Sequence, residues 1–286
     1  MIKATLSDNA PLVSIIVLAY NNLEKYTKTC IDCILKYTKN VNYELILVDN
    51  GTQDGTFEYF KSVPYKRKKV IRLTKNTGGC YGISIGFAYS SARYISFIPN
   101  DVFVTANWLL NLLKCTESDE RIGMVTPVCN YASNYQMVDL KYKNFEDMQS
   151  KAEAYNVPDP KKWEERLRLI TLGTLYKREC IDIAGFNDYG FLHDFVDDDI
   201  TFRIRRAGYK TILCRDTFVC HAGKINDKGD KLAEKAIEKG RNIFKDKYHG
   251  IDAWSDVCNY EPSMMSILNV SKTIKSTNVL GIDVLC

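Results

Sequence analysis

Val13-Ser-Ile-Ile-Val-Leu-Ala19 is a short apolar run in which β-branched residues dominate. A run of this kind is typical of a strand that is buried on both faces of a parallel sheet. Asn21 and Asn22 end the run, and residues 24–36 follow with apolar side chains near helical spacing. The stretch therefore predicts a buried strand followed by a helix, which is the opening unit of an α/β domain.

The same alternation of strand and helix continues downstream. Strands are expected at residues 43–48, 70–73 and 94–98, and helices at residues 56–62, 82–91 and 107–115. Strands that alternate with helices favour a mostly parallel sheet flanked by helices, with right-handed crossovers between neighbouring strands. Ligands of such sheets bind outside the carboxyl ends of the strands.

Polar residues follow each of the first four expected strands. These clusters are Tyr20-Asn21, Asp49-Asn50, residues 76–79 and Asn100-Asp101. One such cluster would be an ordinary turn. Because parallel strands place their carboxyl ends on one edge, four clusters together predict a binding site at that edge.

The second half of the chain is less regular. Residues 130–168 are polar and aromatic, with helices expected at 145–155 and 161–169, and we interpret them as an insertion over the site. Strands are expected at 170–176 and 210–214, and helices at 198–207 and 231–248. We expect one domain over residues 1–250, with a donor half at about 12–128 and an acceptor and base half at about 129–250. Residues 251–286 would be a C-terminal extension, the start of a further region.

Composition excludes several classes of protein. The 286 residues are 45% hydrophobic and 26% charged, and the net charge is 39 − 35 = +4, too small for a nucleic-acid-binding protein. We find no signal peptide and no apolar stretch of the roughly 18–20 residues that a membrane span needs, so we expect a cytoplasmic protein, in solution or at the inner face of the membrane. Cys30 and Cys33 form a single CxxC pair without a second pair, which disfavours a zinc site.

Three groups of residues could carry chemistry. Asp101 follows an expected strand, where a carboxylate can bind a divalent cation or simply cap a turn. Asp194, Asp197, Asp198 and Asp199 crowd the start of an expected helix, and capping needs fewer carboxylates than this. His221 follows a strand-like segment, as either a functional or a structural histidine.

The ordered set of motifs resembles the inverting glycosyltransferases of family two, which have a GT-A-type fold. The first half contributes VSIIVLAYN (13–21), LVDNGTQDG (47–55), NTGG (76–79) and FIPND (97–101). The second half contributes GTLYKR (173–178), GFND (185–188), VDDDITFR (196–203) and AGY (207–209). The resemblance covers roughly residues 12–249 and favours the rhamnosyltransferase-like or N-acetylglucosaminyltransferase-like branch. It implies a GT-A-type, Rossmann-like sheet with an acceptor-side insertion.

The resemblance also implies roles for individual residues. Donor binding would fall to Leu18, Ala19, Tyr20, Asn21, Asp49, Asn50, Asn76, Gly78, Gly79, Asn100 and Asp101. Asp101 and His221 would hold Mn²⁺ or Mg²⁺ at the donor diphosphate, and Asp197 would be the general base. His193 and Trp108 are candidates for the acceptor site.

The chain departs from the family pattern at two places. Pro99 occupies the position of the first Asp of Asp-X-Asp, so the cation site depends on Asp101. Val196 occupies a position that is often Glu, and Asp198 one that is usually not acidic, so the base could be Asp197 or Asp198.

The expected reaction transfers a sugar from a nucleotide-sugar donor to an acceptor hydroxyl. UDP-N-acetylglucosamine is the favoured donor and dTDP-rhamnose the next. The acceptor could be a surface glycan or a protein Ser/Thr, such as that of a flagellin. A non-catalytic module that binds nucleotide sugars or glycans is the main rival. A nucleotidyltransferase or a dehydrogenase is disfavoured, since no Gly-x-Gly-x-x-Gly follows the first strand and no Walker-type loop is present.

Overall fold

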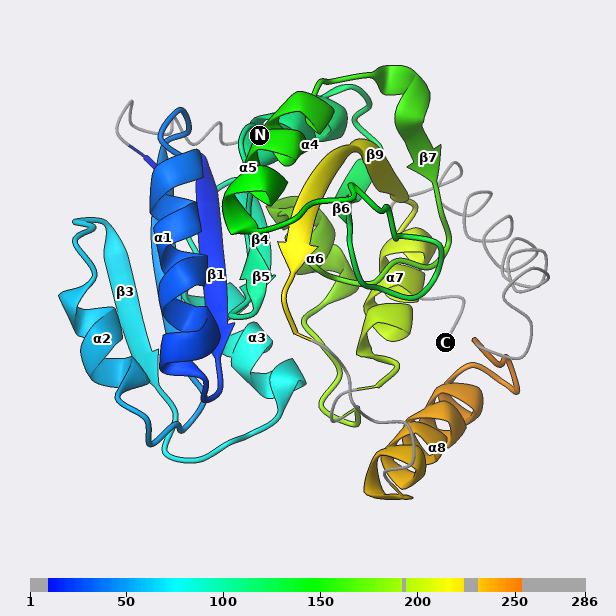
Figure 1. Ribbon diagram of the computed structural model, residues 1–286. Helices are drawn as coiled ribbons and strands as arrows, with labels where there is room; N and C mark the ends of the chain where they lie inside the picture. The colour runs from blue at the N-terminus through cyan, green and yellow to red at the C-terminus, as the bar shows by residue number, and fades with distance from the viewer. Residues whose placement is uncertain (1–9, 192–193, 224–230, 254–286) are drawn as a thin grey trace.

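The computed structural model describes residues 10–191, 194–223 and 231–253, which form a sheet flanked by helices (Figure 1). The strands are β1 (Val13–Ala19), β2 (Tyr43–Asp49), β3 (Lys68–Arg72), β4 (Tyr94–Pro99), β5 (Val102–Phe103), β6 (Ile122–Cys129), β7 (Trp163–Glu165), β8 (Thr174–Lys177) and β9 (Lys210–His221). The helical elements are η1 (Leu23–Thr27), α1 (Lys28–Tyr37), α2 (Thr56–Ser62), α3 (Gly79–Tyr89), α4 (Trp108–Glu117), α5 (Phe145–Tyr155), η2 (Pro160–Lys162), α6 (Arg178–Ala184), α7 (Val196–Arg206) and α8 (Lys231–Lys247).

The strands form one sheet in the order β3-β2-β1-β4-β8-β6-β9-β5, with β7 paired to β9. The first four strands are parallel, as the alternating pattern predicts. Beyond them β8 runs antiparallel to both of its neighbours, while β9 runs parallel to β6. The predicted α/β fold is confirmed, and the sheet is parallel in its first half and mixed in its second.

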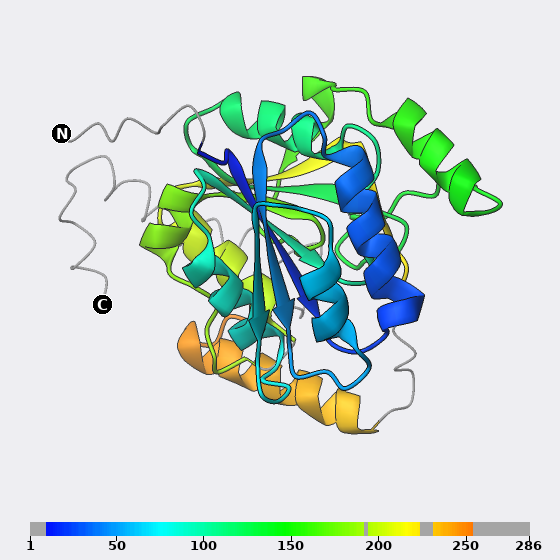
Figure 2. The ribbon, with the colours of Figure 1, turned by 90° about the vertical axis from the view of Figure 1, so that its left-hand side faces the viewer.

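Helices cover both faces of the sheet. Figure 2 shows the sheet between α1 and α5 on one side and α6 and α7 on the other. The strands β1, β2 and β6 are buried almost throughout, because they lie inside the sheet and are covered on both faces. This burial explains why the opening strand is an unbroken apolar run rather than an alternating one.

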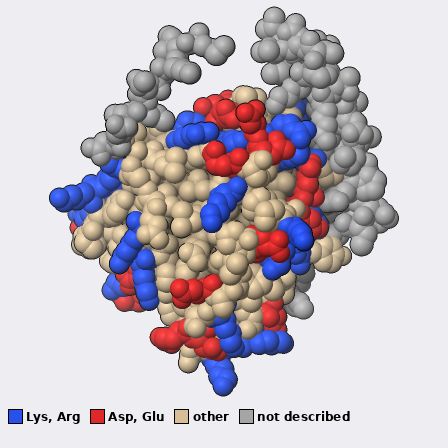
Figure 3. Space-filling model, turned by 90° about the horizontal axis from the view of Figure 1, so that it is seen from above, with Lys and Arg blue, Asp and Glu red and all other residues tan. Residues whose placement is uncertain are grey.

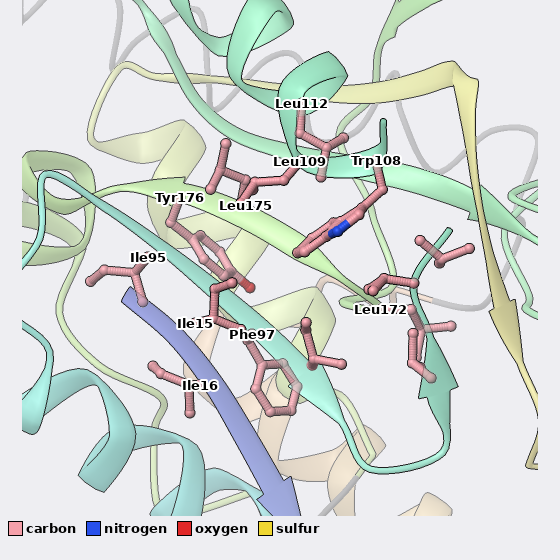
Figure 4. Packing of buried hydrophobic residues seen from close by; sticks show 14 of the residues in the cluster. Ile15, Ile16, Ile95, Phe97, Trp108, Leu109, Leu112, Leu172, Leu175 and Tyr176 are labelled. Atoms are coloured by element: carbon pink, nitrogen blue, oxygen red, sulfur yellow. The ribbon is translucent and has the colours of Figure 1, made fainter. Parts of the chain in front are cut away.

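The main core lies between β1, β4, β8 and α4 (Figure 4). Ile15, Phe97 and Tyr176 meet there, and Trp108 contributes the largest fully buried side chain. Each such aliphatic or aromatic side chain contributes about 1.5–3 kcal/mol by leaving water. The core therefore holds strands of both halves of the sheet together and fixes the edge at which they end.

Several elements differ from the expectation, among them β5 and α6, which were not expected. Residues 161–169 were expected to be helical, but they contain the end of η2 and the strand β7, which pairs with β9. Pairing with a distant strand outweighs local helix propensity here. β6 has no counterpart among the expected strands. It contains Pro127, which lies at a shift in its register with β9, where a missing backbone donor is tolerated.

The surface adds two observations. On the face seen in Figure 3, basic and acidic side chains are interspersed and do not form a stripe of one sign. No helix in the described part of the chain is long and apolar enough to cross a bilayer.

Close packing of α3 on β1 depends on glycine. A Cβ atom added to Gly86 would lie 2.4 Å from Cγ2 of Ile16, whereas one added to Gly79 would meet nothing within 4 Å. We expect Gly86→Ala to lower the free energy of unfolding by about 1–3 kcal/mol through overpacking. Urea denaturation measures the change, with Gly79→Ala in the same helix as the control. Equal stability of both variants would show that α3 does not pack closely on β1.

Candidate active site

The predicted polar clusters lie together at one edge of the sheet. Ala19 pairs in register with Asp49, and the backbone N–H of Asn50 donates to the carbonyl of Ala19 over 2.9 Å. On the other side of β1, the N–H of Asn100 donates to the carbonyl of Leu18 over 3.1 Å. Backbone hydrogen bonds therefore tie the carboxyl ends of β1, β2 and β4 into one surface, as the sequence predicts.

Asp49 offers a buried acceptor at this surface. Its side chain is fully buried, and its Oδ1 accepts a hydrogen bond from the N–H of Thr52 over 2.8 Å. Its Oδ2 lies 3.5 Å from Nε of Arg72 but makes no hydrogen bond within the described residues. Buried carboxylate oxygens are normally hydrogen-bonded, and here the nearby Arg72 guanidinium compensates the charge of this oxygen without a hydrogen bond.

Asn50 shapes the loop before α3 rather than facing solvent. Its Nδ2 donates to Oδ1 of Asn76 over 3.0 Å and to the carbonyl of Gly78 over 3.2 Å, and its Oδ1 accepts from the N–H of Thr77. Gly78 has φ 83°, a conformation that favours glycine. Asn50 and Asn76 therefore hold the loop in shape, while Gly79 faces open space where a ligand could approach the backbone.

Asp101 and His221 meet although they are far apart in the sequence. β5 follows β4 after two residues and pairs with β9 in the register Val102↔His221. The N–H of Ala222 also donates to the carbonyl of Asp101 over 2.8 Å. As a result, Oδ2 of Asp101 lies 3.4 Å from Nε2 of His221. The structure thus brings together the two residues that the family resemblance implies as cation ligands.

The insertion after β6 fixes the orientation of His221. Asn130 accepts from its backbone N–H over 2.7 Å and donates to its carbonyl over 3.1 Å. The carbonyl of Tyr131 lies 2.8 Å from Nδ1. Because a carbonyl can only accept, Nδ1 carries a proton, and in the neutral ring the lone pair of Nε2 is directed to Asp101. Burial lowers the pKa of His221, but the hydrogen bond and charge of Asp101 and the Tyr131 carbonyl outweigh it, so the pKa is raised overall.

This pair fits a divalent cation. An imidazole nitrogen and a carboxylate oxygen are ligands that Mn²⁺ accepts. A side chain at Gly223 would collide with Asp101, since its Cβ would lie 2.0 Å from Oδ2. Among the described residues no group of three or more His, Cys, Asp or Glu side chains forms a complete metal site. A cation bound to this pair would need further ligands besides these two side chains.

The acidic cluster at the start of α7 divides into structural and accessible members. Asp198 is 2% exposed and forms an ion pair with Nε of the buried Arg168. Asp199 is 1% exposed and binds Nε of Arg203 at 2.8 Å and Nζ of Lys247 at 2.6 Å. Both carboxylates are neutralised by cations inside the protein, so neither is suited to take a proton from a substrate.

Asp197 is the partly exposed member of the trio. Its Oδ1 accepts hydrogen bonds from the N–H (3.3 Å) and the hydroxyl of Thr171, which precedes β8 at the same edge of the sheet. Burial and, to a smaller extent, the negative charge of Asp197 raise the pKa of the Cys80 thiol to about 12. The charge of Asp197 therefore acts on Cys80, which lies in the first turn of α3.

A second, smaller core supports this region. It contains Phe195, Phe202, Phe244 and Tyr248, which join α7 to α8. The hydroxyl of Tyr248 also donates to Asp199. α8 is therefore a support for the acidic cluster. The sequence shows α8 as a charged amphipathic helix, but carries no local signal of what that helix contacts.

The two acceptor candidates have different outcomes. Trp108 is fully buried in the main core, and its Nε1 donates to Oγ1 of Thr38 over 3.2 Å. The expectation that it contacts an acceptor is therefore corrected, since neither face of its ring is open to a ligand. His193 lies outside the described residues.

The sequence analysis did not single out Asn130, Tyr131 and Thr171, although all three take part in the site. Their hydrogen-bond partners are distant in the sequence, so no local pattern indicates them.

Comparison with known proteins assigns the family. Residues 14–164, more than half of the chain, match the family model of glycosyl transferase family 2. The chain belongs to glycosyltransferase family 2. Two curated relatives are an uncharacterized glycosyltransferase of Haemophilus influenzae, 30% identical over 117 residues, and glycosyltransferase AglE of Haloferax volcanii, 25% identical over 224 residues. The first alignment covers 40% of this chain and 36% of its relative, so the chain matches about a third of that protein. The second covers 77% of this chain and 69% of its relative.

Solved structures confirm the GT-A-like fold of this family 2 chain. The structure of GalNAc-T7 with UDP, GalNAc and Mn²⁺ matches with a TM-score of 0.64 at 15% identity, over 94% of this chain and 55% of that one. The mannosyltransferase PcManGT from Pyrobaculum calidifontis, in complex with GDP-Man and Mn²⁺, matches with a TM-score of 0.58 at 19% identity, over 96% and 78%. At these identities the likeness concerns the fold. The rhamnosyltransferase-like or N-acetylglucosaminyltransferase-like branch stays a prediction.

The division of the acidic cluster predicts a difference in stability. Asp198→Ala removes the carboxylate partner of a buried guanidinium, and we expect it to lower the free energy of unfolding by about 3–5 kcal/mol. Asp197→Ala removes a partly exposed hydrogen-bond acceptor, with an expected loss of about 0.5–1.5 kcal/mol. Urea denaturation of the two variants side by side measures both values. A larger loss for Asp197→Ala would contradict the structural assignment of Asp198.

Proposed function

We propose that this chain is an inverting, metal-dependent glycosyltransferase that moves a sugar from a nucleotide-sugar donor to an acceptor hydroxyl. The observation that carries the proposal is the position of Asp197, a partly exposed carboxylate bonded to Thr171, at the same sheet edge as the Asp101–His221 pair. Membership of family 2 and the GT-A-like fold support the same reaction.

The donor would bind along the ends of the first strands. Residues 18–21 with Asp49 would hold the nucleobase and ribose, as the family resemblance implies, and the open backbone at Gly79 is suited to the donor beyond them. Asp101 and His221 would hold Mn²⁺ or Mg²⁺. A bound divalent cation supplies Lewis acidity that stabilises the negative charge on a leaving diphosphate.

Asp197 would accept the proton of the attacking hydroxyl. A positioned carboxylate contributes about 10²- to 10⁴-fold to the rate of such a transfer. The hydrogen bonds from Thr171 orient one oxygen of Asp197. The geometry favours Asp197 over Asp198, because Asp198 is buried against Arg168. In-line attack from the side opposite the leaving group would invert the anomeric carbon.

The donor and acceptor are narrower proposals. We propose UDP-N-acetylglucosamine as the first donor to test and dTDP-rhamnose as the second. The related folds were solved with UDP and with GDP-Man, so a donor panel needs both nucleotides. The acceptor would be a hydroxyl of a surface glycan or of a protein Ser/Thr, such as that of a flagellin.

A non-catalytic module that binds nucleotide sugars is the alternative. Asp198 and Asp199 are engaged in ion pairs, so the acidic cluster as a whole does not argue for catalysis. Release of nucleoside diphosphate from a donor panel, with Mn²⁺ or with EDTA, separates the two. Release from one donor that is lost in EDTA supports the enzyme, whereas donor binding without release in any condition supports the module.

We expect Asp197→Asn to reduce the rate of transfer at least 100-fold, because an amide cannot take the proton. Donor affinity, measured by calorimetry, should stay within about threefold. Asp182→Asn, at an exposed position of α6, is the matched control and should transfer at the parent rate. Normal turnover by Asp197→Asn would remove it from the role of base.

We expect Asp101→Ala to abolish the gain in donor affinity that Mn²⁺ provides. Calorimetric titration of UDP with and without Mn²⁺ measures this gain directly, without any transfer assay. Asp139→Ala is the matched control, since Asp139 is exposed and pairs with Lys141. An unchanged effect of Mn²⁺ in the Asp101 variant would show that the cation binds elsewhere.

A further inference from the structure

A cavity of about 670 Å³ adjoins His221 on the side of α5. Its walls come from the ends of β5 and β9, from the insertion after β6, and from the first turns of α5. The volume falls within the range of about 300–1,000 Å³ of small-molecule sites. The cavity is distinct from the surface at the ends of β1 and β2, where the nucleotide is proposed to bind.

Aromatic rings dominate the lining. They belong to Phe103, Tyr131, Tyr142 and Phe145. Phe103 and Phe145 pack edge to face with ring centroids 6.0 Å apart, and Tyr131 lies at 6.0 Å from the ring of His221. Tyr131 and Phe145 are 38% and 39% exposed, so both rings also face solvent. Partly exposed aromatic side chains of this kind can pack against a ligand through their rings.

The remaining lining is apolar or uncharged, apart from His221. It includes Asn130, Asn144 and Met148, and contains no Asp, Glu, Lys or Arg. Apart from His221, the lining therefore offers no basic side chain to a phosphate or a nucleotide diphosphate. Flat aromatic faces combined with amides suit a ring that has apolar C–H faces and polar hydroxyl edges, which is the chemistry of a neutral sugar.

We propose that this cavity binds a neutral sugar residue of the acceptor, so that the acceptor is a glycan. The inference rests on the proposed function, because it assigns the cavity to the acceptor of that reaction. Tyr131 links the cavity to the cation pair: its ring lines the wall and its carbonyl holds Nδ1 of His221. A sugar bound here would therefore lie next to the reacting centre.

The test uses the ring of Phe145. Phe145→Tyr keeps a flat face, whereas Phe145→Leu keeps apolar character without one. Binding is measured by saturation-transfer NMR with neutral gluco-, galacto- and manno-configured trisaccharides, with 1-octanol and with a Ser/Thr-containing peptide. We expect a trisaccharide to bind the parent and Phe145→Tyr, and to bind Phe145→Leu at least tenfold more weakly. Tyr89→Leu, which changes an exposed tyrosine at the end of α3, is the control and should bind like the parent.

Each other outcome overturns the inference. Equal trisaccharide binding by Phe145→Leu would place the sugar elsewhere, and binding of octanol or peptide alone would make the acceptor a lipid or a protein. Binding of none of the probes would show that the cavity is not a glycan subsite.

Kinetics separate this inference from the proposed function. If transfer occurs and Phe145→Leu raises the KM for the acceptor glycan at least tenfold, with the KM for the donor within twofold, the subsite is supported. If transfer occurs with an unchanged acceptor KM, the subsite is wrong and the enzyme stands. A rise in the donor KM instead would place the donor sugar in the cavity. Trisaccharide binding that depends on Phe145, without nucleotide release from any donor, would keep the subsite and reject the enzyme.

Discussion

The pairing of β5 with β9 is the constraint on which the proposed site depends. β5 is two residues long and directly follows β4, yet it pairs with β9, which lies three strands beyond β4 in the sheet order. The sheet must therefore curl round, and this brings Asp101 to His221. In a flat sheet with the same strands, β8 and β6 would lie between the end of β4, where Asp101 follows, and β9, which carries His221.

Charge compensation inside the protein determines which acidic side chain remains available. Removing a carboxylate from water is costly unless a cation accompanies it. Arg168 accompanies Asp198, and Arg203 and Lys247 accompany Asp199. Asp197 stays partly exposed and bonded to Thr171. The cluster therefore combines a structural function with one group that is suited to proton transfer, and α8 takes part in that arrangement through Lys247.

Prediction from the sequence worked where the signal is local. The opening strand, α2 and α5 lie at or very near the expected positions, because apolar periodicity and flanking turn residues determine them. The polar clusters after β1, β2 and β4 lie on one edge because these strands are parallel. Prediction failed at β7, whose pairing with β9 depends on distant residues, and β6 was not anticipated although eight consecutive residues are buried.

The sequence alone determined the α/β class, the parallel direction of the first four strands and the edge of the site. Through the family resemblance it also indicated the residues that could bind a cation or a proton. Only the tertiary structure decided how those residues are used. Burial of Trp108 removed it from the acceptor site, ion pairs withdrew Asp198 and Asp199, and Asn50 proved to shape a loop. Exposure and partners depend on contacts between segments far apart in the chain, and a linear pattern of residue types carries no record of those contacts.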